Sequence, residues 1–200
     1  MSKDDKTSEL ELHLQYALLG LNFRDRVITL SPDSGDHEDE HQHEIKPDSF
    51  VFVDTGLTEM ERRGRGTVTL KIQSWGGCVK TATAIASRLM ESKFKIITKG
   101  YGTIESAATL LLAAGNERHI SRFCTFMHHE ASYTVSGRHS SIKAQVRQAD
   151  NEEHMWAIWM AGLAKNEEYD AEFFRNAGVH VDSWWSPEQL LHMGLVDKIV

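Results

Sequence analysis

The sequence is poor in cysteine and proline, and it has no long hydrophobic run. Its 200 residues include three prolines and two cysteines, Cys78 and Cys124, which form no metal-spaced pair. Free thiols in a reducing compartment are therefore a simpler reading than a disulfide framework. The longest apolar run, residues 107–114, falls far short of the roughly 20 residues that a membrane-spanning helix needs. Residues 1–6 are polar and no apolar signal core follows them, so we expect a cytoplasmic protein without a membrane partner.

Positive charge is scarcer than negative charge. The chain has 22 Lys and Arg against 29 Asp and Glu, which gives a formal net charge of −7. No segment carries a basic stripe, and this disfavours a nucleic-acid-binding surface. A hydrophobic share of 40% over this length is typical of one globular domain with its own core.

Two segments differ in character from the rest of the chain. Residues 1–25 begin polar and then gain an apolar stripe, which predicts an N-terminal arm or short helix. Residues 31–48 hold two prolines, a glycine and an acidic, His-rich run, and these predict a loop insertion. Its histidines and carboxylates could bind a divalent metal, but they show no fixed ligand spacing. We therefore expect neither a metal site nor a cofactor.

Strand-like and helix-like segments alternate from residue 50 onward. Strands are predicted from β-branched or buried apolar runs, and helices from their 3.6-residue periodicity. The expected strands are 26–30, 67–72, 94–98, 123–128 and 195–200, and the expected helices are 50–63, 79–92, 106–114, 140–165 and 187–193. This alternation indicates βαβ units around a largely parallel sheet, so the predicted fold class is α/β. Residues 26–200 are expected to form one domain with a long projecting helix.

Three turns that follow predicted strands contain residues typical of a hydrolase site. The glycine pair at 76–77 lets the backbone turn sharply and bring its N–H groups close to a ligand. Ser106 heads an apolar helix, where it is either a helix cap or a nucleophile whose neighbour Ala107 offers an N–H to an oxyanion. The histidine pair at 128–129 ends a strand, where a general base for Ser106 would be needed. Each signal alone is weak, because all three features are usually structural.

Taken together and in this order, the turns resemble the Clp protease proteolytic subunit (ClpP) family. The shared elements are Ser74-Trp75-Gly76-Gly77, Gly102 to Ser106, Ala114-Gly115, Met127-His128-His129 and Gly194-Leu195-Val196-Asp197. They cover roughly residues 67–200. The resemblance implies a crotonase-like α/β fold with stacked βαβ units, in which residues 140–165 are the handle helix through which rings of subunits stack.

The resemblance also assigns the catalytic roles. It implies that Ser106 is the nucleophile, that His129 is the general base, and that the N–H groups of Gly77 and Ala107 form the oxyanion hole. An imidazole suits the role of base because its pKa lies near the working pH. His128 is the rival base, but adjacent side chains of a strand point to opposite faces, so only one histidine can face Ser106. The motif favours His129.

The third catalytic residue is where the sequence departs from the family, which normally has an aspartate there. If this sequence is matched to the family pattern backward from Gly194 without gaps, Gly178 takes the place of the aspartate. If residues 173–176 are instead matched to the family's helix that precedes the aspartate, Asn176 takes that place. An asparagine can accept the imidazole N–H but supplies no negative charge, so reduced activity is expected. Asp182 is the other candidate. On sequence alone we favour Asn176.

The function implied by the resemblance is that of an ATP-dependent Clp-type serine endopeptidase subunit. It would cleave unfolded polypeptides through an acyl-enzyme inside a chamber of stacked homo-oligomeric rings, served by an AAA+ unfoldase. The chain has no phosphate-binding glycine-lysine motif, so it would not hydrolyse ATP itself. The missing aspartate is typical of divergent phage- or plasmid-type members. Two alternatives stay open, namely a catalytically silent ring subunit and a crotonase-type acyl-CoA enzyme.

Overall fold

A computed structural model describes residues 19–31, 44–179 and 181–200. Most of the predicted N-terminal arm (1–25) and most of the predicted loop insertion (31–48) therefore lie outside the described residues. In the described ranges, none of the helices combines the length and the apolar character that crossing a membrane requires. Cys78 and Cys124 are both free thiols.

A largely parallel sheet organises the domain. Its main path runs β1-β2-β4-β6-β7-β10, while β8 pairs with β6 and β9 pairs with β8. Only β1–β2 and β8–β9 are antiparallel among these pairings of the described residues. The strands are β1 (Leu21–Asn22), β2 (Val27–Leu30), β4 (Thr67–Ser74), β6 (Lys95–Glu105), β7 (Glu117–Ile120), β8 (Thr125–His128), β9 (Ser183–Trp184) and β10 (Lys198–Ile199). The predicted α/β class is confirmed.

A separate pair of short strands lies beside this sheet. In it, β3 (Glu44–Ile45) runs parallel to β5 (Gly76–Gly77), and Ile45 is the partner of Gly77. The glycine pair predicted as a turn is therefore a short extended segment. It pairs with β3, whose residues come just before α2.

The central strand β6 is shared between two neighbours. Its first half pairs with β7 from Ile97 to Gly100, and its last residues, Thr103 to Glu105, pair with β8. The prediction of a strand at 94–98 was too short. The strand continues to Glu105 because Ile104 is fully buried and keeps the alternation of inward and outward side chains.

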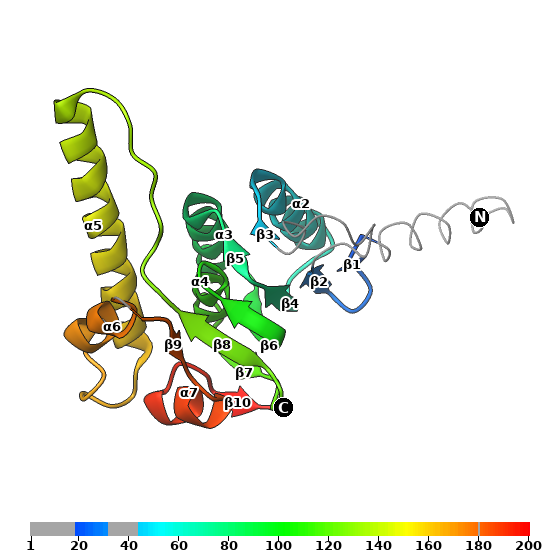
Figure 1. Ribbon diagram of the computed structural model, residues 1–200. Coiled ribbons are helices and arrows are strands. Elements are labelled where there is room, and N and C mark those ends of the chain that lie inside the picture. Colours follow the sequence, from blue (N-terminus) through cyan, green and yellow to red (C-terminus); the bar gives the residue numbers. More distant parts are fainter. Residues whose placement is uncertain (1–18, 32–43, 180) are drawn as a thin grey trace, which may run out of the picture.

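Helices flank the sheet and one of them projects from the domain. Figure 1 shows α2, α3 and α4 grouped together, and α5 rising beyond the rest of the molecule. All six residues of α4 are buried, as its almost wholly apolar sequence predicts. The helices are α2 (Pro47–Arg62), α3 (Val79–Met90), α4 (Ala108–Ala113), α5 (His139–Leu163), α6 (Ala171–Ala177) and α7 (Pro187–Met193).

Helix boundaries agree with the sequence where capping residues mark them. The predicted helix at 187–193 has the observed bounds of α7, because Ser186 forms a capping box with Gln189 and Gly194 ends the helix at a φ of 86°. In contrast, α4 begins two residues later than predicted, so Ser106 lies before the helix. The short strands β1, β3, β7 and β9 were not predicted, and β3 and the first residues of α2 fall within the predicted loop at 31–48.

A partly buried ion pair attaches the C-terminal strand to the sheet. The Arg118 guanidinium donates to both carboxylate oxygens of Asp197, at 3.0 and 2.9 Å, and is only 9% exposed. The backbone N–H groups of the two residues also take part: the Arg118 N–H donates to the carboxylate oxygen Asp197 Oδ2, and the Asp197 N–H donates to the Arg118 carbonyl. Burial alone would raise the pKa of Asp197, but the hydrogen bonds from Arg118 outweigh it and lower the pKa.

Removing this carboxylate should destabilise the fold. We expect Asp197→Ala to lower the free energy of unfolding by about 3 kcal/mol, because it leaves a buried guanidinium without its partner. Urea unfolding at pH 7 measures this loss, and an Arg118→Met/Asp197→Leu double variant should recover most of it. Because the folded-state pKa of Asp197 is lowered, the contribution is present above the ordinary carboxyl pKa of about 4 and disappears as the pH falls through the folded-state value. Unfolding of Asp197→Ala at the wild-type midpoint would contradict the prediction.

Candidate active site

Ser106 occupies a strained turn between β6 and α4. Its φ is 53°, which is unusual for a residue other than glycine and costs of the order of 1–3 kcal/mol. Two neighbours hold the turn: the Ser106 N–H donates to the Met127 carbonyl at 2.9 Å, and its carbonyl accepts the N–H and the hydroxyl of Thr109. Both β8 and α4 therefore fix the serine at the end of the strand.

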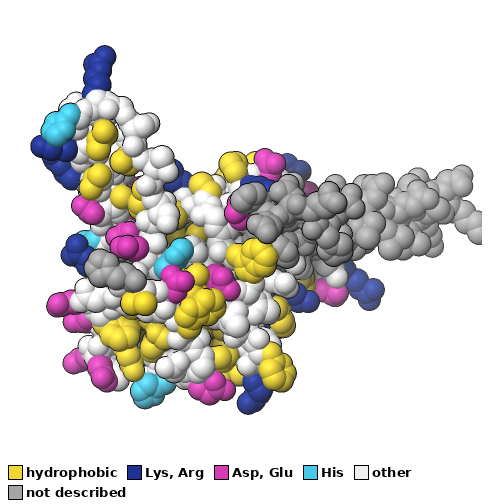
Figure 2. Space-filling view, in the orientation of Figure 1, with side chains coloured by type: hydrophobic (Ala, Val, Ile, Leu, Met, Phe, Trp, Pro, Cys, Tyr) yellow, Lys and Arg dark blue, Asp and Glu magenta, His cyan; other side chains and the backbone are white. Residues whose placement is uncertain are grey.

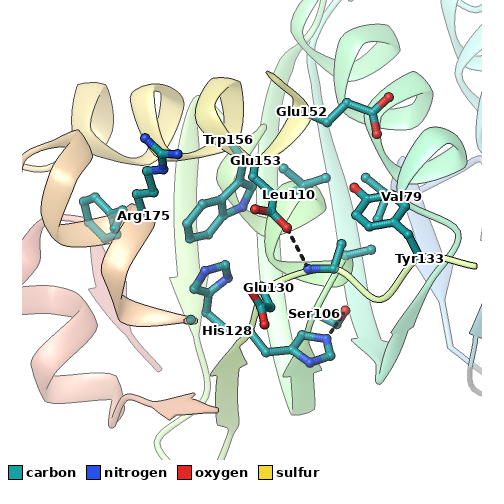
Figure 3. A pocket seen from close by; sticks show the side chains of 15 residues that line it. Val79, Ser106, Leu110, His128, Glu130, Tyr133, Glu152, Glu153, Trp156 and Arg175 are labelled. Carbon is teal, nitrogen blue, oxygen red and sulfur yellow. Dashed lines mark hydrogen bonds between the residues drawn. The ribbon is translucent and has the colours of Figure 1, made fainter. Parts of the chain in front are cut away.

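His129 lies within hydrogen-bonding distance of this serine. Its Nε2 is 2.7 Å from Ser106 Oγ, and the side chain is about one third exposed. In the tautomer that leaves Nε2 unprotonated, the hydroxyl donates to it, as a nucleophile does to its general base. Figure 3 shows Ser106 at the lower edge of the pocket. The structure thus brings together the serine and histidine that the sequence singled out.

His128 points into the protein instead. Its ring stacks on Trp156 with centroids 3.7 Å apart and an interplanar angle of 9°, and only 9% of the residue is exposed. Burial, aided by the neighbouring His129, lowers the pKa of His128 to about 3. The alternation of side chains along a strand accounts for the opposite directions of the two histidines. His128 is therefore a neutral packing residue at working pH.

The two candidates for the third residue lie in different places. Asp182 Oδ1 is 3.8 Å from His129 Nδ1, on a carboxylate that is 55% exposed. Asn176 is exposed near the end of α6, and no hydrogen bond joins it to His129 among the described residues. At 3.8 Å the contact is electrostatic rather than a direct hydrogen bond. The geometry therefore favours Asp182 over Asn176.

Gly178 lies against the His128 side chain and the backbone of His129 and Glu130. A Cβ on Gly178 would come within 2.8 Å of Glu130 N, His128 Nε2 and the His129 carbonyl carbon. Its own carbonyl accepts the Glu130 N–H at 3.2 Å. The position that a gap-free count assigns to the family's aspartate therefore has no room for a side chain. A carboxylate can reach the imidazole only from farther along the chain, as Asp182 does.

The glycine pair approaches Ser106 from the side opposite β8. A Cβ on Gly76 would lie 2.6 Å from Ser106 Cβ and 3.0 Å from Ala107 N, and Gly76 has a φ of 102°. A Cβ on Gly77 would meet the Ile45 backbone at 2.6 Å. Only glycine fits both positions, because of space and of backbone conformation. Ala107 precedes α4 as its N-cap, so its N–H has no intrahelical acceptor.

A narrow cavity of about 70 Å³ opens beside Ser106. Its walls are largely apolar, from Val79, Leu110, Trp156 and Phe174. Carboxylates and one guanidinium also line it: Glu130, Glu152, Glu153 and Arg175. Figure 3 shows these groups converging from α3, α4, α5, α6 and the segment after β8.

The cavity residues on α5 were not identified from the sequence. Glu153 and Trp156 are three residues apart and therefore share one helix face, which is the signal that could have paired them. The Trp156 ring is partly buried against the hydrophobic core and stacks on His128. In the part of the chain that the structure describes, no three His, Cys, Asp or Glu side chains gather closely enough to hold a metal ion. Residues 37–43 of the His-rich run lie outside that part.

The buried neutral state of His128 should appear in the pH dependence of stability. The unfolded chain takes up a proton near the ordinary histidine value of 6.5, whereas the folded chain does so near 3. Between these values the unfolded state binds more protons, so stability should fall by about 1.4 kcal/mol per pH unit on acidification. Urea unfolding between pH 6.5 and 4 should show a shallower slope for His128→Phe, which keeps the stack on Trp156. The exposed His154→Gln variant is the control, and equal slopes for His128→Phe and wild type would contradict the assignment.

Comparison with known protein families gives one match that covers most of the domain. A family model described as Clp protease matches residues 53–200. This range begins within α2, runs to the C-terminus, and includes the glycine pair, Ser106 and His129. A comparison with curated proteins finds no match. The resemblance inferred from the turns is thereby confirmed, and the chain belongs to the Clp protease family.

Proposed function

We propose that this protein is a serine endopeptidase subunit of the Clp type, with Ser106 as nucleophile and His129 as general base. The observation that carries the proposal is the 2.7 Å contact between Ser106 Oγ and His129 Nε2 at the mouth of a cavity. A serine hydroxyl is a weak nucleophile unless an adjacent base accepts its proton. The strained turn at Ser106 supports the same role, because residues held in such conformations cluster at active sites.

The reaction follows from these two groups. Ser106 Oγ bonds to the carbonyl carbon of the scissile peptide while its proton passes to His129 Nε2. The tetrahedral intermediate then collapses, the C–N bond breaks, and the imidazolium returns the proton to the leaving amine. Water attacks the resulting ester with His129 again as base, which releases the acid and restores the serine. No cofactor takes part in this sequence.

For the developing oxyanion, we assign the N–H groups of Gly77 and Ala107. The close approach of Gly76, which precedes Gly77, to Ser106 and Ala107 supports this assignment, since it brings the backbone of the glycine pair beside the serine. Donors that are already in place stabilise charge in the transition state without reorganisation.

The third member of the triad is Asp182 in this proposal, in place of the Asn176 favoured on sequence grounds. The Asp182 carboxylate faces the imidazole nitrogen that does not contact Ser106. Catalytic contacts are often long before substrate binds, and a small shift of the exposed Asp182 segment would form the hydrogen bond. Its negative charge would then stabilise the imidazolium.

Family membership supports the wider assignment. We propose that residues 26–200 form a crotonase-like domain and that α5 is the handle through which homo-oligomeric rings stack to enclose a chamber. Unfolded polypeptides would reach this chamber with the help of an ATP-dependent unfoldase of the cytoplasm. Hydrophobic side chains lie on the exposed part of α5 (Figure 2), where Val146, Met155 and Ile158 are 46–65% exposed. An apolar surface of this kind is typical of a subunit contact.

A catalytically silent ring subunit is the second candidate. The 3.8 Å separation and the high exposure of Asp182 favour it, because a poorly oriented imidazole is a weaker base. A crotonase-type acyl-CoA enzyme offers no account of the Ser106–His129 contact.

Labelling with a fluorophosphonate probe tests the nucleophile. We expect modification at Ser106 in the wild-type protein, located by peptide mapping, because the probe reacts only with a serine activated by a base. Ser106→Ala and His129→Ala should lose labelling and lower peptidase activity about 1000-fold or more, while the exposed Ser141→Ala should behave as wild type. Wild-type protein that forms oligomers but does not react would favour the silent subunit.

The third residue is tested by separate changes at the two candidates. Asp182→Asn should lower kcat about 100-fold with little change in KM, because it removes charge from the imidazolium in the transition state. Asn176→Ala and Asn176→Asp should both stay within twofold of wild type. If the Asn176 variants changed kcat and Asp182→Asn did not, the role would belong to Asn176.

A further inference from the structure

One side chain in the cavity beside Ser106 has no role in the proposed chemistry. Glu153 projects from α5 between Trp156 and Leu110, toward the segment that follows His129 (Figure 3). Its carboxylate therefore lies among apolar walls, in the same cavity as the serine. Placing a charge against such walls is unfavourable unless a partner compensates it.

The groups around Glu153 compensate it poorly. Burial raises the pKa of Glu153, and Glu130 and Asp150 raise it further, whereas the Ala131 N–H and Arg175 lower it. Three carboxylates line the cavity against the single guanidinium of Arg175. The carboxylates outnumber the guanidinium in the cavity, and a cation that entered it would relieve repulsion among the carboxylates.

A purely structural role does not explain a carboxylate at this position. Glu153 Oε1 accepts one hydrogen bond, from the Ala131 N–H at 3.3 Å. A carboxylate has about four acceptor positions, so this bond uses a small part of its capacity. A glutamine would accept the same bond through its carbonyl oxygen without bringing a charge into the cavity.

The shape of the cavity limits what can enter. Its volume of about 70 Å³ is several times the roughly 10–15 Å³ that one water needs, yet it is small for a large aromatic ring. Val79, Leu110 and Trp156 offer apolar surface along it. An unbranched chain of methylene groups with a charged end can bury its stem on such surface while the end reaches a polar group.

We propose that Glu153 selects substrates in which the residue on the acyl side of the scissile bond is lysine or arginine. The methylene stem packs against the apolar walls, and the cationic end pairs with the Glu153 carboxylate. This inference rests on the proposed peptidase function, because the cavity takes a substrate side chain only if Ser106 attacks the adjacent carbonyl.

A pair of phosphonate inhibitors tests the proposal directly. Peptidyl diphenyl phosphonates carrying either a lysine or a norleucine side chain differ only in the terminal ammonium, and both react with an activated serine. For the wild-type protein we expect the lysine compound to modify Ser106 at least ten times faster than the norleucine compound. Glu153→Gln should bring the ratio of the two rates to within threefold of one, and Glu153→Lys should reverse the preference in favour of norleucine. The control is Glu188→Gln, an exposed carboxylate change on α7, which should keep the wild-type ratio.

The outcomes separate the two proposals. Modification of Ser106 by both compounds at equal rates in the wild-type protein would overturn the role of Glu153 and leave the peptidase function standing. A lysine preference that survives in Glu153→Gln would likewise overturn it. If neither compound nor the fluorophosphonate modified Ser106, the proposed function would fall, and the specificity inference with it.

Discussion

The parallel pairing between the end of β6 and β8 is the constraint on which the site depends. It aligns Glu105 with Met127, so the residues that follow each strand emerge at the same edge of the sheet. The bond from the Ser106 N–H to the Met127 carbonyl extends this pairing by one residue and holds the serine in its left-handed conformation. His129 follows Met127 by two residues and meets Ser106 for that reason. A sheet edge with this register can hold a nucleophile and a base from segments more than 20 residues apart.

Two glycines allow neighbouring backbone segments to approach this edge of the sheet closely. Gly76 lets one backbone segment approach Ser106 more closely than any side chain would permit, and Gly178 does the same for the segment beside the histidines. The second approach has a chemical consequence. Because Gly178 fills the space next to His128 and His129 with backbone alone, the carboxylate that faces the imidazole comes from Asp182. In the proposed triad, the departure from the family pattern is therefore a change in which residue supplies the charge.

The long helix α5 joins the sheet edge that carries Ser106 and His129 to the outer surface. Trp156 covers His128 on one side of the cavity, and Glu153 accepts the Ala131 N–H two residues after His129. Residues elsewhere on the same helix are exposed and apolar. An event that moves α5, such as contact with another subunit, would therefore act on the cavity walls and on the segment that carries His129.

The sequence by itself determined the α/β class, most of the elements, and the pairing of Ser106 with His129. Periodicity, capping residues and short motifs are local features of the sequence. They predict structure where a single residue type meets a local requirement, as Ser186 does at the start of α7 and Gly194 at its end. Only the tertiary structure decided the extent of β6, which of Asp182 and Asn176 lies near His129, and the place of Glu153 in the cavity. These depend on distances between segments that are far apart along the chain, and the space around Gly178 is set by packing that no local pattern records.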